Sequence, residues 1–492
     1  MVFSPDEVRL IKQSGRSPEQ VLKQFHYFST GFPYIKLLRP AKITDGILSL
    51  NNDEIEVFLE KYASDGKRHS IVKFVPASGA ATRMFKDLYR YLLEDFDEVP
   101  PTIESFFASI QNYPFFEKLE ELLQRNGYIL KEEIQKRNYK LILEYLLTEK
   151  GLNFGNLPKA LLPFHRYPNQ VRTAFEEHLV EAAYYAQQGD KRCQLHFTVS
   201  PQHLENFKKL MNEVLPYYEK RYSVKYDITF SVQDAATDTI AAEMDNTLFH
   251  DGQGQLLFRP GGHGALIYNL NKLQYDIVFI KNIDNLLNEN NIELLVKTKK
   301  ILAGYLIYIK EKIDNYLQLL EKKELKSQNL KEILHFAENV LNIKGINEHN
   351  VFEKLNRPVR VCGMVKNEGE PGGGPFWVQS KNGDVSLQIV ESSQIDLKNE
   401  EQRKVFDDST HFNPVDIVCS FKDFRGNYFS LPDFIDPETG FISIKSFEGK
   451  SIKTMELPGL WNGSMADWIT VFIEVPLATF SPVKTIFDLF GK

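Results

Sequence analysis

The sequence predicts an α/β protein, and three observations support this fold class. Residues 71–76 are a short apolar run that ends at a proline, which is typical of a buried strand. Small residues follow this run, and a helix is expected from about Phe85 to Leu93. Strand-like runs at 193–200 and 226–233 are joined by a predicted helix at about 201–221, and such alternation indicates a sheet covered by helices.

The composition is that of a globular protein. The chain has 492 residues, which is enough for roughly two to four packed units. Hydrophobic residues make up 42% of the chain and charged residues 25%. The formal net charge of -7 argues against a duplex-DNA binder, so no nucleic-acid partner is expected. A local basic pocket for phosphates remains compatible with this charge.

The cysteines and the N-terminus predict a cytoplasmic protein. Cys193, Cys362 and Cys419 form no CxxC pair and no zinc-type spacing, and their scatter suggests a reducing compartment. We interpret Cys193, Cys362 and His196 as structural. The chain starts without the basic and apolar regions of a signal peptide, and no apolar stretch reaches the roughly 20 residues of a membrane span.

Further elements follow from the apolar periodicity, and they divide the chain into three predicted parts. Helices are expected within 1–65, which also contains loops, and at 103–150, about 171–187 and 286–343. Strands are expected at 275–280, within 357–430 and at 468–475. The predicted parts are an N-terminal helical segment (1–65), a central α/β domain (66–430) with helical insertions at about 103–150 and 286–343, and a C-terminal segment (431–492).

The segment 78–84, Ser-Gly-Ala-Ala-Thr-Arg-Met, follows the predicted strand directly. Small residues let a triphosphate approach the backbone closely, and Arg83 could supply a fixed cation. The alternative is a tight turn between strand and helix with one surface arginine. The segment is neither a P-loop nor a Rossmann fingerprint, because both glycine patterns are absent. The residues expected to cradle the nucleotide are Ser78, Gly79, Ala80, Ala81 and Thr82.

This segment resembles the GxGTRM loop of the sugar-phosphate nucleotidyltransferases, and further segments resemble the UDP-sugar pyrophosphorylases in the same order. Residues 157–163, Leu-Pro-Lys-Ala-Leu-Leu-Pro, look like the family's Pro-Lys continuation. Similar segments follow at 230–233, 260–268, 278–285, 386–394 and 481–489. The chain also resembles a bacterial family of uncharacterised function and similar length, so the resemblance implies no particular sugar.

The resemblance implies a nucleotide-diphospho-sugar transferase fold (GT-A, Rossmann-like), with a central mixed sheet, helical insertions and a small C-terminal region. It also implies that a sugar 1-phosphate is joined to a nucleoside triphosphate, with UTP expected, and that pyrophosphate is released. The implied phosphate-binding residues are Arg83, Lys159 and Lys484, and Asp284 is the implied ligand of Mg²⁺. The implied nucleotide residues downstream are Gln233, Gly261, Gly262 and His263. The implied sugar residues are Asn282, Gly373 and Glu391.

Each of these residues has a simpler interpretation. Lys484 could be a solvated surface lysine, and Asp284 could cap a helix that begins near Leu286. His263 lies between glycines, which would leave the backbone free to approach a ligand, but it could equally be a loop histidine without a role. The glycines at 372–374 precede Phe376 and Trp377, which could form either a sugar-binding loop or a turn packed on a core tryptophan.

Two departures from the family pattern leave other functions open. Ala81 stands where the family has a glycine, and its methyl group could narrow the approach of the phosphates. The insertion between Arg83 and Lys159 is also unusual. One alternative is therefore a catalytically inactive nucleotide- or sugar-binding regulator. Another is a glycosyltransferase, which would need a DxD pair; Asp433 and Asp436 have the wrong spacing, and residues 282–284 match only in part. The oligomeric state is left open.

Overall fold

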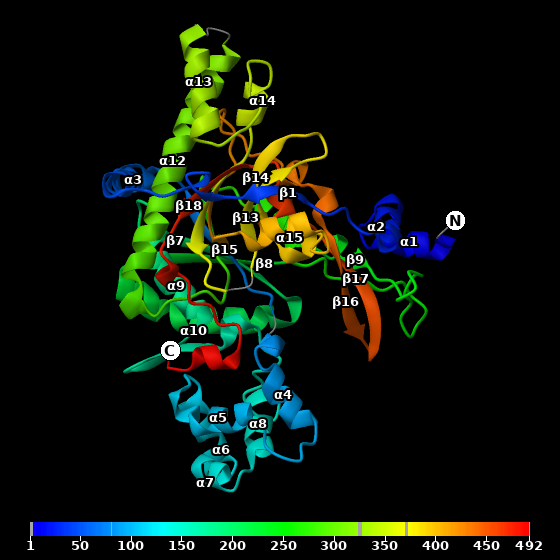
Figure 1. The fold of residues 1–492 in the computed structure, drawn as a ribbon. Helices are drawn as coiled ribbons and strands as arrows, with labels where there is room; N and C mark the ends of the chain where they lie inside the picture. The colour runs from blue at the N-terminus through cyan, green and yellow to red at the C-terminus, as the bar shows by residue number, and fades with distance from the viewer. Residues whose placement is uncertain (1–2, 80, 323–326, 370–371, 492) are drawn as a thin grey trace. The chain divides into compact units, whose positions relative to one another are not determined.

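The computed structural model describes residues 3–79, 81–322, 327–369 and 372–491 (Figure 1). The chain forms two compact units. Unit 1 contains Met1–Phe74, Ser231–Ile280 and Thr298–Leu477, and unit 2 contains Val75–Phe230, Lys281–Lys297 and Ala478–Lys492. The two units therefore interleave along the chain, whereas the predicted parts 1–65, 66–430 and 431–492 are consecutive.

Unit 1 is built on a mixed sheet, which confirms the predicted fold class. The strand order is β2 (Lys42–Ile43), β3 (Gly46–Leu48), β18 (Ile469–Glu474), β12 (Val359–Lys366), β15 (His411–Ser420), β11 (Ile277–Ile280) and β4 (Ile71–Pro76), whose last two residues belong to unit 2. β15 runs antiparallel to both of its neighbours, whereas the pairs β11–β4, β12–β18 and β18–β3 are parallel. Every residue of β15 is buried, as expected for an apolar strand that is covered on both faces.

Two structures in unit 1 were not predicted. Residues 36–48, expected to be helix or loop, contain β1 (Lys36–Pro40), β2 and β3 between the helices α2 (Pro18–Thr30) and α3 (Asn52–Asp65). β1 pairs with β13 (Gly374–Gln379), which pairs in turn with β14 (Val385–Val390). A second hairpin joins β16 (Phe441–Phe447) and β17 (Lys450–Glu456) within the predicted C-terminal segment.

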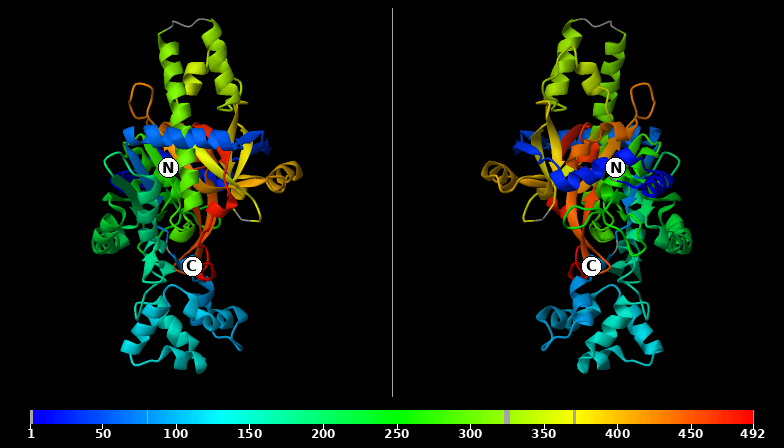
Figure 2. Two further views of the ribbon diagram at one scale, coloured as in Figure 1. Left: turned by 90° about the vertical axis from the view of Figure 1, so that its left-hand side faces the viewer. Right: turned by 90° about the vertical axis from the view of Figure 1, so that its right-hand side faces the viewer.

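The second predicted helical insertion is present as α12 (Glu293–Glu321) and α13 (Ser327–Asn339), which lie side by side (Figure 2). The rings of Tyr316 and Phe336 join the two helices at 5.4 Å between centroids. The Tyr316 hydroxyl also donates a hydrogen bond to Glu332 at 2.8 Å. Thus the apolar periodicity of 286–343 is used for packing between helices.

Unit 2 combines two neighbouring strands with helices. The strands are β7 (Arg192–Val199) and β8 (Lys225–Val232), which α10 (Leu204–Tyr222) connects as predicted. Helix α9 (Ala174–Tyr185) is buried along most of its length and begins at a capping box between Thr173 and Glu176. The helix α4 (Lys86–Leu93) follows the loop at 78–84, also as predicted.

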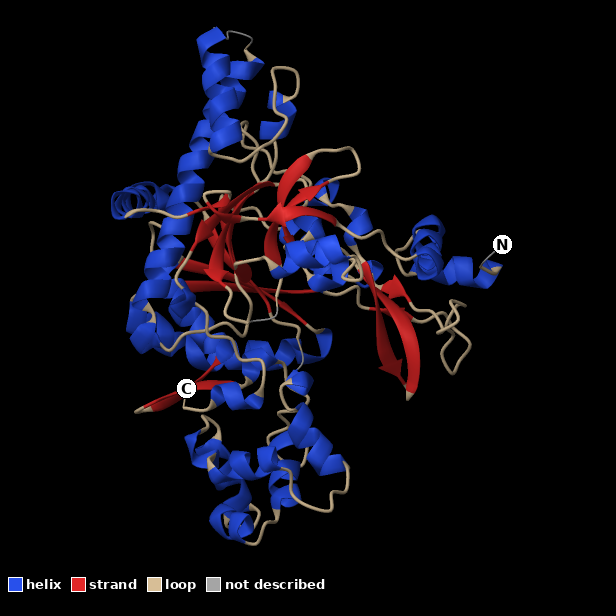
Figure 3. Ribbon diagram, in the orientation of Figure 1, coloured by secondary structure: helices blue, strands red, loops and turns tan. Residues whose placement is uncertain are grey.

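The range of the first predicted helical insertion contains a group of short helices in unit 2 (Figure 3). The helices are α5 (Pro101–Ala108), α6 (Phe116–Arg125), α7 (Leu130–Gln135) and α8 (Tyr139–Leu147). Buried aromatic rings pack them together: Phe107 of α5 stacks on Tyr139 of α8 at 4.1 Å between centroids. None of the described helices is long and apolar enough to cross a membrane.

Candidate functional site

The loop that follows β4 in unit 2 presents exposed polar residues after a buried strand end. Ala77 is buried, and its N–H donates a hydrogen bond to the carbonyl of Thr198 in β7 at 2.8 Å. Ser78, Gly79, Thr82 and Arg83 are exposed, and residues 81–83 form a single 3-10 turn before α4. Ala80 lies outside the described residues. The sequence feature expected to approach phosphates is therefore at the surface of the unit.

Ala81 points the other way. Its side chain is fully buried, and its N–H donates to the carbonyl of Leu157 at 3.1 Å. Its methyl group is therefore used in packing and does not project from the loop surface. The expected narrowing of the phosphate approach by this methyl group is not found.

Lys159 joins three distant parts of unit 2. Its N–H donates to the carbonyl of Gly79 at 3.3 Å, which ties the Pro-Lys segment to the loop after β4. Its Nζ lies 2.6 Å from Oδ2 of Asp284 and donates to the carbonyl of Val483 at 2.7 Å. The N–H of Val483 donates in turn to the carbonyl of Asp284 at 2.9 Å. We call Lys159, Asp284 and Val483 the lysine junction.

Lys484 directly follows this junction and is exposed. The turn around it is fixed by Asp488, whose Oδ2 accepts the N–H groups of Lys484 and Thr485 at 2.8 and 2.7 Å. The N–H of Ile486 then donates to the carbonyl of Met84, the residue after Arg83, at 3.1 Å. These contacts place the Lys484 backbone beside the junction and tie its segment to the loop at 78–84.

Asp284 is not a helix cap, because the next α-helix, α12, begins only at Glu293. Its carboxylate is instead partly exposed and paired with Lys159, with side-chain exposures of 22% and 14%. Among the described residues no group of three or more His, Cys, Asp or Glu side chains could hold a metal. Mg²⁺, however, is commonly bound by one or two carboxylates together with substrate phosphates. The single carboxylate of Asp284 fits an ion shared with phosphates and not an ion held by protein alone.

A second lysine–carboxylate pair also involves a residue that follows β11, but this pair is buried. Lys281 and Glu181 of α9 are in hydrogen-bond contact at 2.5 Å, and their side chains are 0% and 1% exposed. The Tyr185 hydroxyl donates to the other oxygen of Glu181 at 3.2 Å. Asn282 lies half-buried between Lys281 and Ile283, which are both buried. Lys281 thus fixes the chain on which Asn282 and Asp284 stand.

The glycine loop at 261–264 lies in unit 1, and its glycines are closely packed against neighbouring residues. A Cβ on Gly261 or Gly264 would meet backbone oxygens of the same unit, Thr237 at 2.9 Å and Pro458 at 2.1 Å. Gly262 has φ +76°, and a Cβ there would lie 2.7 Å from Oε2 of Glu456. The glycines therefore allow this loop to pack against residues 456–458, and the side where a Cβ would stand is filled by protein.

His263 is fixed in one tautomer by its neighbours. Its Nδ1 accepts the N–H of Leu460 at 3.1 Å, so the neutral ring carries its hydrogen on Nε2. The ring stacks on Trp461 with centroids 4.3 Å apart. Burial lowers the pKa of His263, while the carboxylates of Glu391 and Glu456 oppose this shift. The ring is therefore neutral near pH 7 and offers an N–H donor.

The remaining predicted residues of unit 1 lie at strand ends. The Nε2 group of Gln233, which follows β8, donates to Thr237 Oγ1 and Asp238 Oδ1 at 3.2 and 3.3 Å. Gly373 and Glu391 adjoin the paired ends of β13 and β14, and a Cβ on Gly373 would lie 3.4 Å from Cγ of Glu391. Glu391 is half-buried, and its N–H donates to Oε1 of Gln394 at 3.0 Å.

Glu456, at the end of β17, was missed by the sequence analysis. Its Oε1 accepts the Nζ of Lys445 at 3.0 Å, while its Oε2 faces Gly262. The alternation of apolar and polar residues in 441–447 could have predicted the hairpin. The contact with Gly262 could not have been predicted from sequence, because it joins residues far apart in the chain.

The residues interpreted as structural are buried. Cys193, Cys362 and Cys419 are free and buried, and burial raises the pKa of Cys193 to about 12. Burial also lowers the pKa of His196 to about 4, and its Nδ1 lies 2.7 Å from the hydroxyl of Thr229. None of these side chains is among the residues predicted to bind phosphate, nucleotide or sugar.

Solved structures similar to this chain include several sugar-nucleotide enzymes. A mutant UDP-glucose pyrophosphorylase from Leishmania major in complex with UDP-glucose is 12% identical, covering 98% of this chain and 77% of its own, with a TM-score of 0.45. A UDP-glucose phosphorylase from Trypanosoma brucei is 12% identical over the same shares, with a TM-score of 0.47. The uridine diphosphate N-acetylglucosamine pyrophosphorylase of Trypanosoma brucei in complex with an inhibitor is 13% identical, covering 95% and 74%, with a TM-score of 0.48.

No curated protein matches this chain significantly. One family model does, and its match extends over residues 4–492, which is nearly the whole chain. The chain therefore belongs to the family described as Domain of unknown function (DUF4301).

Proposed function

We propose that this protein is a sugar-1-phosphate nucleotidyltransferase that uses a nucleoside triphosphate, with UTP as the expected one. The lysine junction carries this proposal. Four segments that resemble nucleotidyltransferase motifs are far apart in sequence, yet hydrogen bonds at Gly79, Lys159, Asp284 and Val483 join them within unit 2. If residues 78–84 were only a surface turn with one exposed arginine, these contacts between distant segments would not be needed.

The reaction is an in-line displacement. A phosphate oxygen of the sugar 1-phosphate attacks the α-phosphorus of the triphosphate, the bond between the α-phosphorus and its bridging oxygen breaks, and pyrophosphate leaves. No protein nucleophile is required, so the protein must position the phosphates and neutralise their charge. Exposed or partly exposed cations on rigid segments supply both effects.

Each cation of unit 2 has a role that follows from its position. Two of the three N–H donors of Lys159 are used by Asp284 and Val483, which leaves one donor for a phosphate oxygen. Arg83 is exposed after the loop at 78–84, where its planar group can hold the β- and γ-phosphates bidentately. Lys484 adds a third positive charge for the sugar phosphate or the transferring group.

Asp284 is the group that would hold Mg²⁺. When bound together with the triphosphate, this ion would neutralise charge on the phosphate oxygens. The carboxylate also holds Lys159 in place, so Asp284 has a positioning role toward that lysine. In unit 1, the proposed contacts to base and sugar are Gln233, the loop at 261–263, Gly373 and Glu391, and in unit 2 Asn282.

The first experiment measures pyrophosphate release from purified protein with Mg²⁺, each of the four nucleoside triphosphates and a panel of sugar 1-phosphates. Release that requires one triphosphate and one sugar phosphate together is the expected result. Arg83→Ala should lower turnover by about 10²–10³-fold, the usual cost of removing one group that stabilises transition-state charge. The matched control is Lys86→Ala, since Lys86 is also exposed and cationic but belongs to α4.

Two results would contradict the proposal. One is an Arg83→Ala protein that turns over as fast as the parent protein. The other is tight UTP binding in calorimetry without pyrophosphate release on any sugar phosphate, which would instead support a nucleotide-binding regulator. Transfer of sugar from a UDP-sugar with release of UDP would favour a glycosyltransferase.

A further inference from the structure

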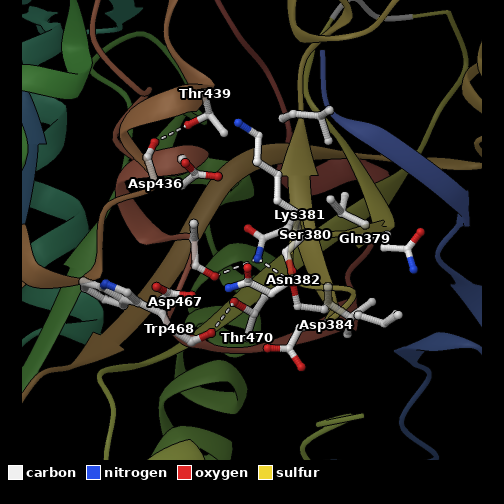
Figure 4. Close-up of a pocket in the computed structure, with 18 of the residues that line it drawn as sticks. Gln379, Ser380, Lys381, Asn382, Asp384, Asp436, Thr439, Asp467, Trp468 and Thr470 are labelled. Atoms are coloured by element: carbon white, nitrogen blue, oxygen red, sulfur yellow. Dashed lines mark hydrogen bonds between the residues drawn. The ribbon is translucent and has the colours of Figure 1, made fainter. Parts of the chain in front are cut away.

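Unit 1 contains a cavity of about 840 Å³ that none of the predicted site residues lines. This volume is typical of sites that enclose a small molecule. Its walls are the segment 378–389, which contains the β13–β14 turn and most of β14, the segments 435–439 and 462–470, and residues near 33–36, 341–344 and 354–357. Figure 4 shows the polar side chains that these walls contribute.

The cavity lies at the amino ends of two parallel strands of the large sheet. It includes Ile469 and Thr470, where β18 begins, and Arg357, which precedes β12. Ligands of open α/β sheets bind beyond the carboxyl ends of the parallel strands, whereas these are amino ends. Along β13, Gly374 and Gln379 stand five residues apart, which corresponds to about 16 Å. The β13–β14 turn is therefore distant from Gly373, whereas the lining along β14 ends at Ile389, two residues before Glu391; neither Gly373 nor Glu391 lines the cavity.

Two buried polar atoms of the lining have no hydrogen-bond partner. They are the indole Nε1 of Trp468, a donor, and the Oδ1 of Asn462, an acceptor. The two residues are only 5% and 3% exposed. Buried polar groups in proteins nearly always find partners, and leaving them unpaired is costly. Both atoms have almost no accessible surface, so protein covers them and they do not face the cavity.

Behind the lining lies a fully buried guanidinium. Arg360 donates from Nε to the Thr470 hydroxyl at 2.8 Å and from Nη1 to the carbonyl of Trp461 at 2.6 Å, while Nη2 has no partner. Thr470 in turn donates to the carbonyl of Trp468 at 3.3 Å. The cavity floor is therefore held by a polar network.

The charges on the lining nearly cancel. Lys354 pairs with Asp384 at 3.0 Å, Arg357 lies 3.7 Å from Asp467, and Lys381 pairs with Glu438. Lys381 of the turn reaches across toward Asp436 and Thr439 (Figure 4). An anion would meet these carboxylates, and a cation would meet the lysines and the arginine. The lining therefore favours an uncharged ligand.

Asp436 is the lining carboxylate that no lysine or arginine pairs with among the described residues. Its Oδ1 accepts the N–H of Glu438 at 3.0 Å, and its own N–H donates to the carbonyl of Gly463 at 2.9 Å. Burial raises the pKa of Asp436, and the nearby Glu438 and Asp467 add to this shift. Hydroxyl groups of a ligand could donate to this carboxylate, and the exposed amide of Asn382 could both donate and accept.

We propose that this cavity is a second ligand site, separate from the predicted nucleotide and sugar residues, and that it binds an uncharged sugar. The mixture of donors and acceptors, the paired charges and the size of the cavity all match a ring that carries several hydroxyl groups. The site does not depend on nucleotidyl transfer, because none of its residues is assigned to that reaction.

Binding can be measured by saturation-transfer NMR and calorimetry on the full-length protein without nucleotide. The probes are glucose, galactose, N-acetylglucosamine and maltose, with inorganic phosphate and spermidine as charged comparators. At least one uncharged sugar should bind saturably. Asp436→Ala and Asn382→Ala should each weaken that binding by about tenfold, the loss expected for one well-placed hydrogen bond.

The matched control is Glu391→Ala, which should leave this binding unchanged because Glu391 does not line the cavity. The idea fails if no uncharged sugar binds at tens of millimolar, if only phosphate or spermidine binds, or if Glu391→Ala abolishes binding while Asp436→Ala does not. Turnover in the pyrophosphate assay is scored separately. Failure there leaves this test intact, and failure here leaves the proposed reaction intact.

Discussion

Two lysine–carboxylate pairs in unit 2 differ in their access to water. Lys281 of one pair and Asp284 of the other are only three residues apart in sequence. Lys281 and Glu181 are fully buried, whereas the side chains of Lys159 and Asp284 keep 14% and 22% of their exposure. A buried pair cannot exchange its partner without leaving an uncompensated charge inside the protein. A partly exposed lysine can exchange its partner for a phosphate. The comparison separates a group that holds the chain in place from one that can take part in chemistry.

The largest effect is expected at the buried pair. Lys281→Met should lower the free energy of unfolding by about 3–5 kcal/mol, because it removes the cation that neutralises the buried Glu181 carboxylate. Urea unfolding followed by circular dichroism measures this loss. Lys281→Met combined with Glu181→Gln should recover much of the stability, since neither side chain of the pair then carries a charge. Equal free energies of unfolding for the single and double variants would show that the buried Glu181 charge does not cause the loss of stability.

The next effect is on turnover. Lys159→Ala should lower kcat by about 10²–10³-fold, since one group that stabilises transition-state charge is lost. The free energy of unfolding should change by only about 1 kcal/mol, because partly exposed ion pairs contribute little. Pyrophosphate release and urea unfolding of the same preparation separate the two outcomes, with Lys86→Ala as control. A large loss of stability in Lys159→Ala would make this lysine structural, like Lys281.

A pH titration extends the comparison to a buried group that carries no charge. The pKa of His196 is lowered by burial to about 4, whereas the unfolded chain should titrate near the ordinary value of about 6.5. The unfolded state therefore binds more protons between these values, so stability should fall as pH drops from about 6.5 to about 4. The shift corresponds to about 3 kcal/mol. Urea unfolding at several pH values should give a flatter profile for His196→Gln. An unchanged profile would assign the pH dependence to other groups.

The smallest effect is expected at the glycine loop of unit 1. Gly262→Ala should destabilise the protein by about 1–2 kcal/mol, because φ +76° strains any residue with a Cβ. The added methyl group would also displace the carboxylate of Glu456. Thermal unfolding measures the change, and Gly252→Ala is a suitable control, since its φ is not positive and a Cβ there meets nothing within 4 Å. Equal melting temperatures for the two variants would contradict the packing role of Gly262.

Local patterns predicted much of the fold. The apolar run of β4, the helix α4 and the helical insertions were all predicted, because burial and apolar periodicity are properties of neighbouring residues. The strands β1 to β3 were missed. β2 and β3 have only two and three residues, and strands this short are defined by their pairing partners and not by their own sequence.

The motif resemblance assigned Lys159 and Lys484 to phosphates and Asp284 to Mg²⁺, but it predicted none of the contacts of the lysine junction. The sequence did not indicate that Asp284 pairs with Lys159, a contact that spans 125 positions. Nor did it show that Ala81 faces inward. Nor did it predict that the glycines at 261–264 pack against residues 456–458. Glu456 and the cavity beside Asp436 carried no sequence signal at all.

The sequence by itself determined the α/β class, the positions of the main helices and strands, and the residue types available for phosphate chemistry. These follow from side-chain size, polarity and spacing along the chain. Only the tertiary structure decided which lysine is buried and which is accessible, which glycines are needed for packing, and where polar atoms remain unpaired. Those properties depend on groups that are distant in sequence, since burial and electrostatics are set by whatever lies nearby in space.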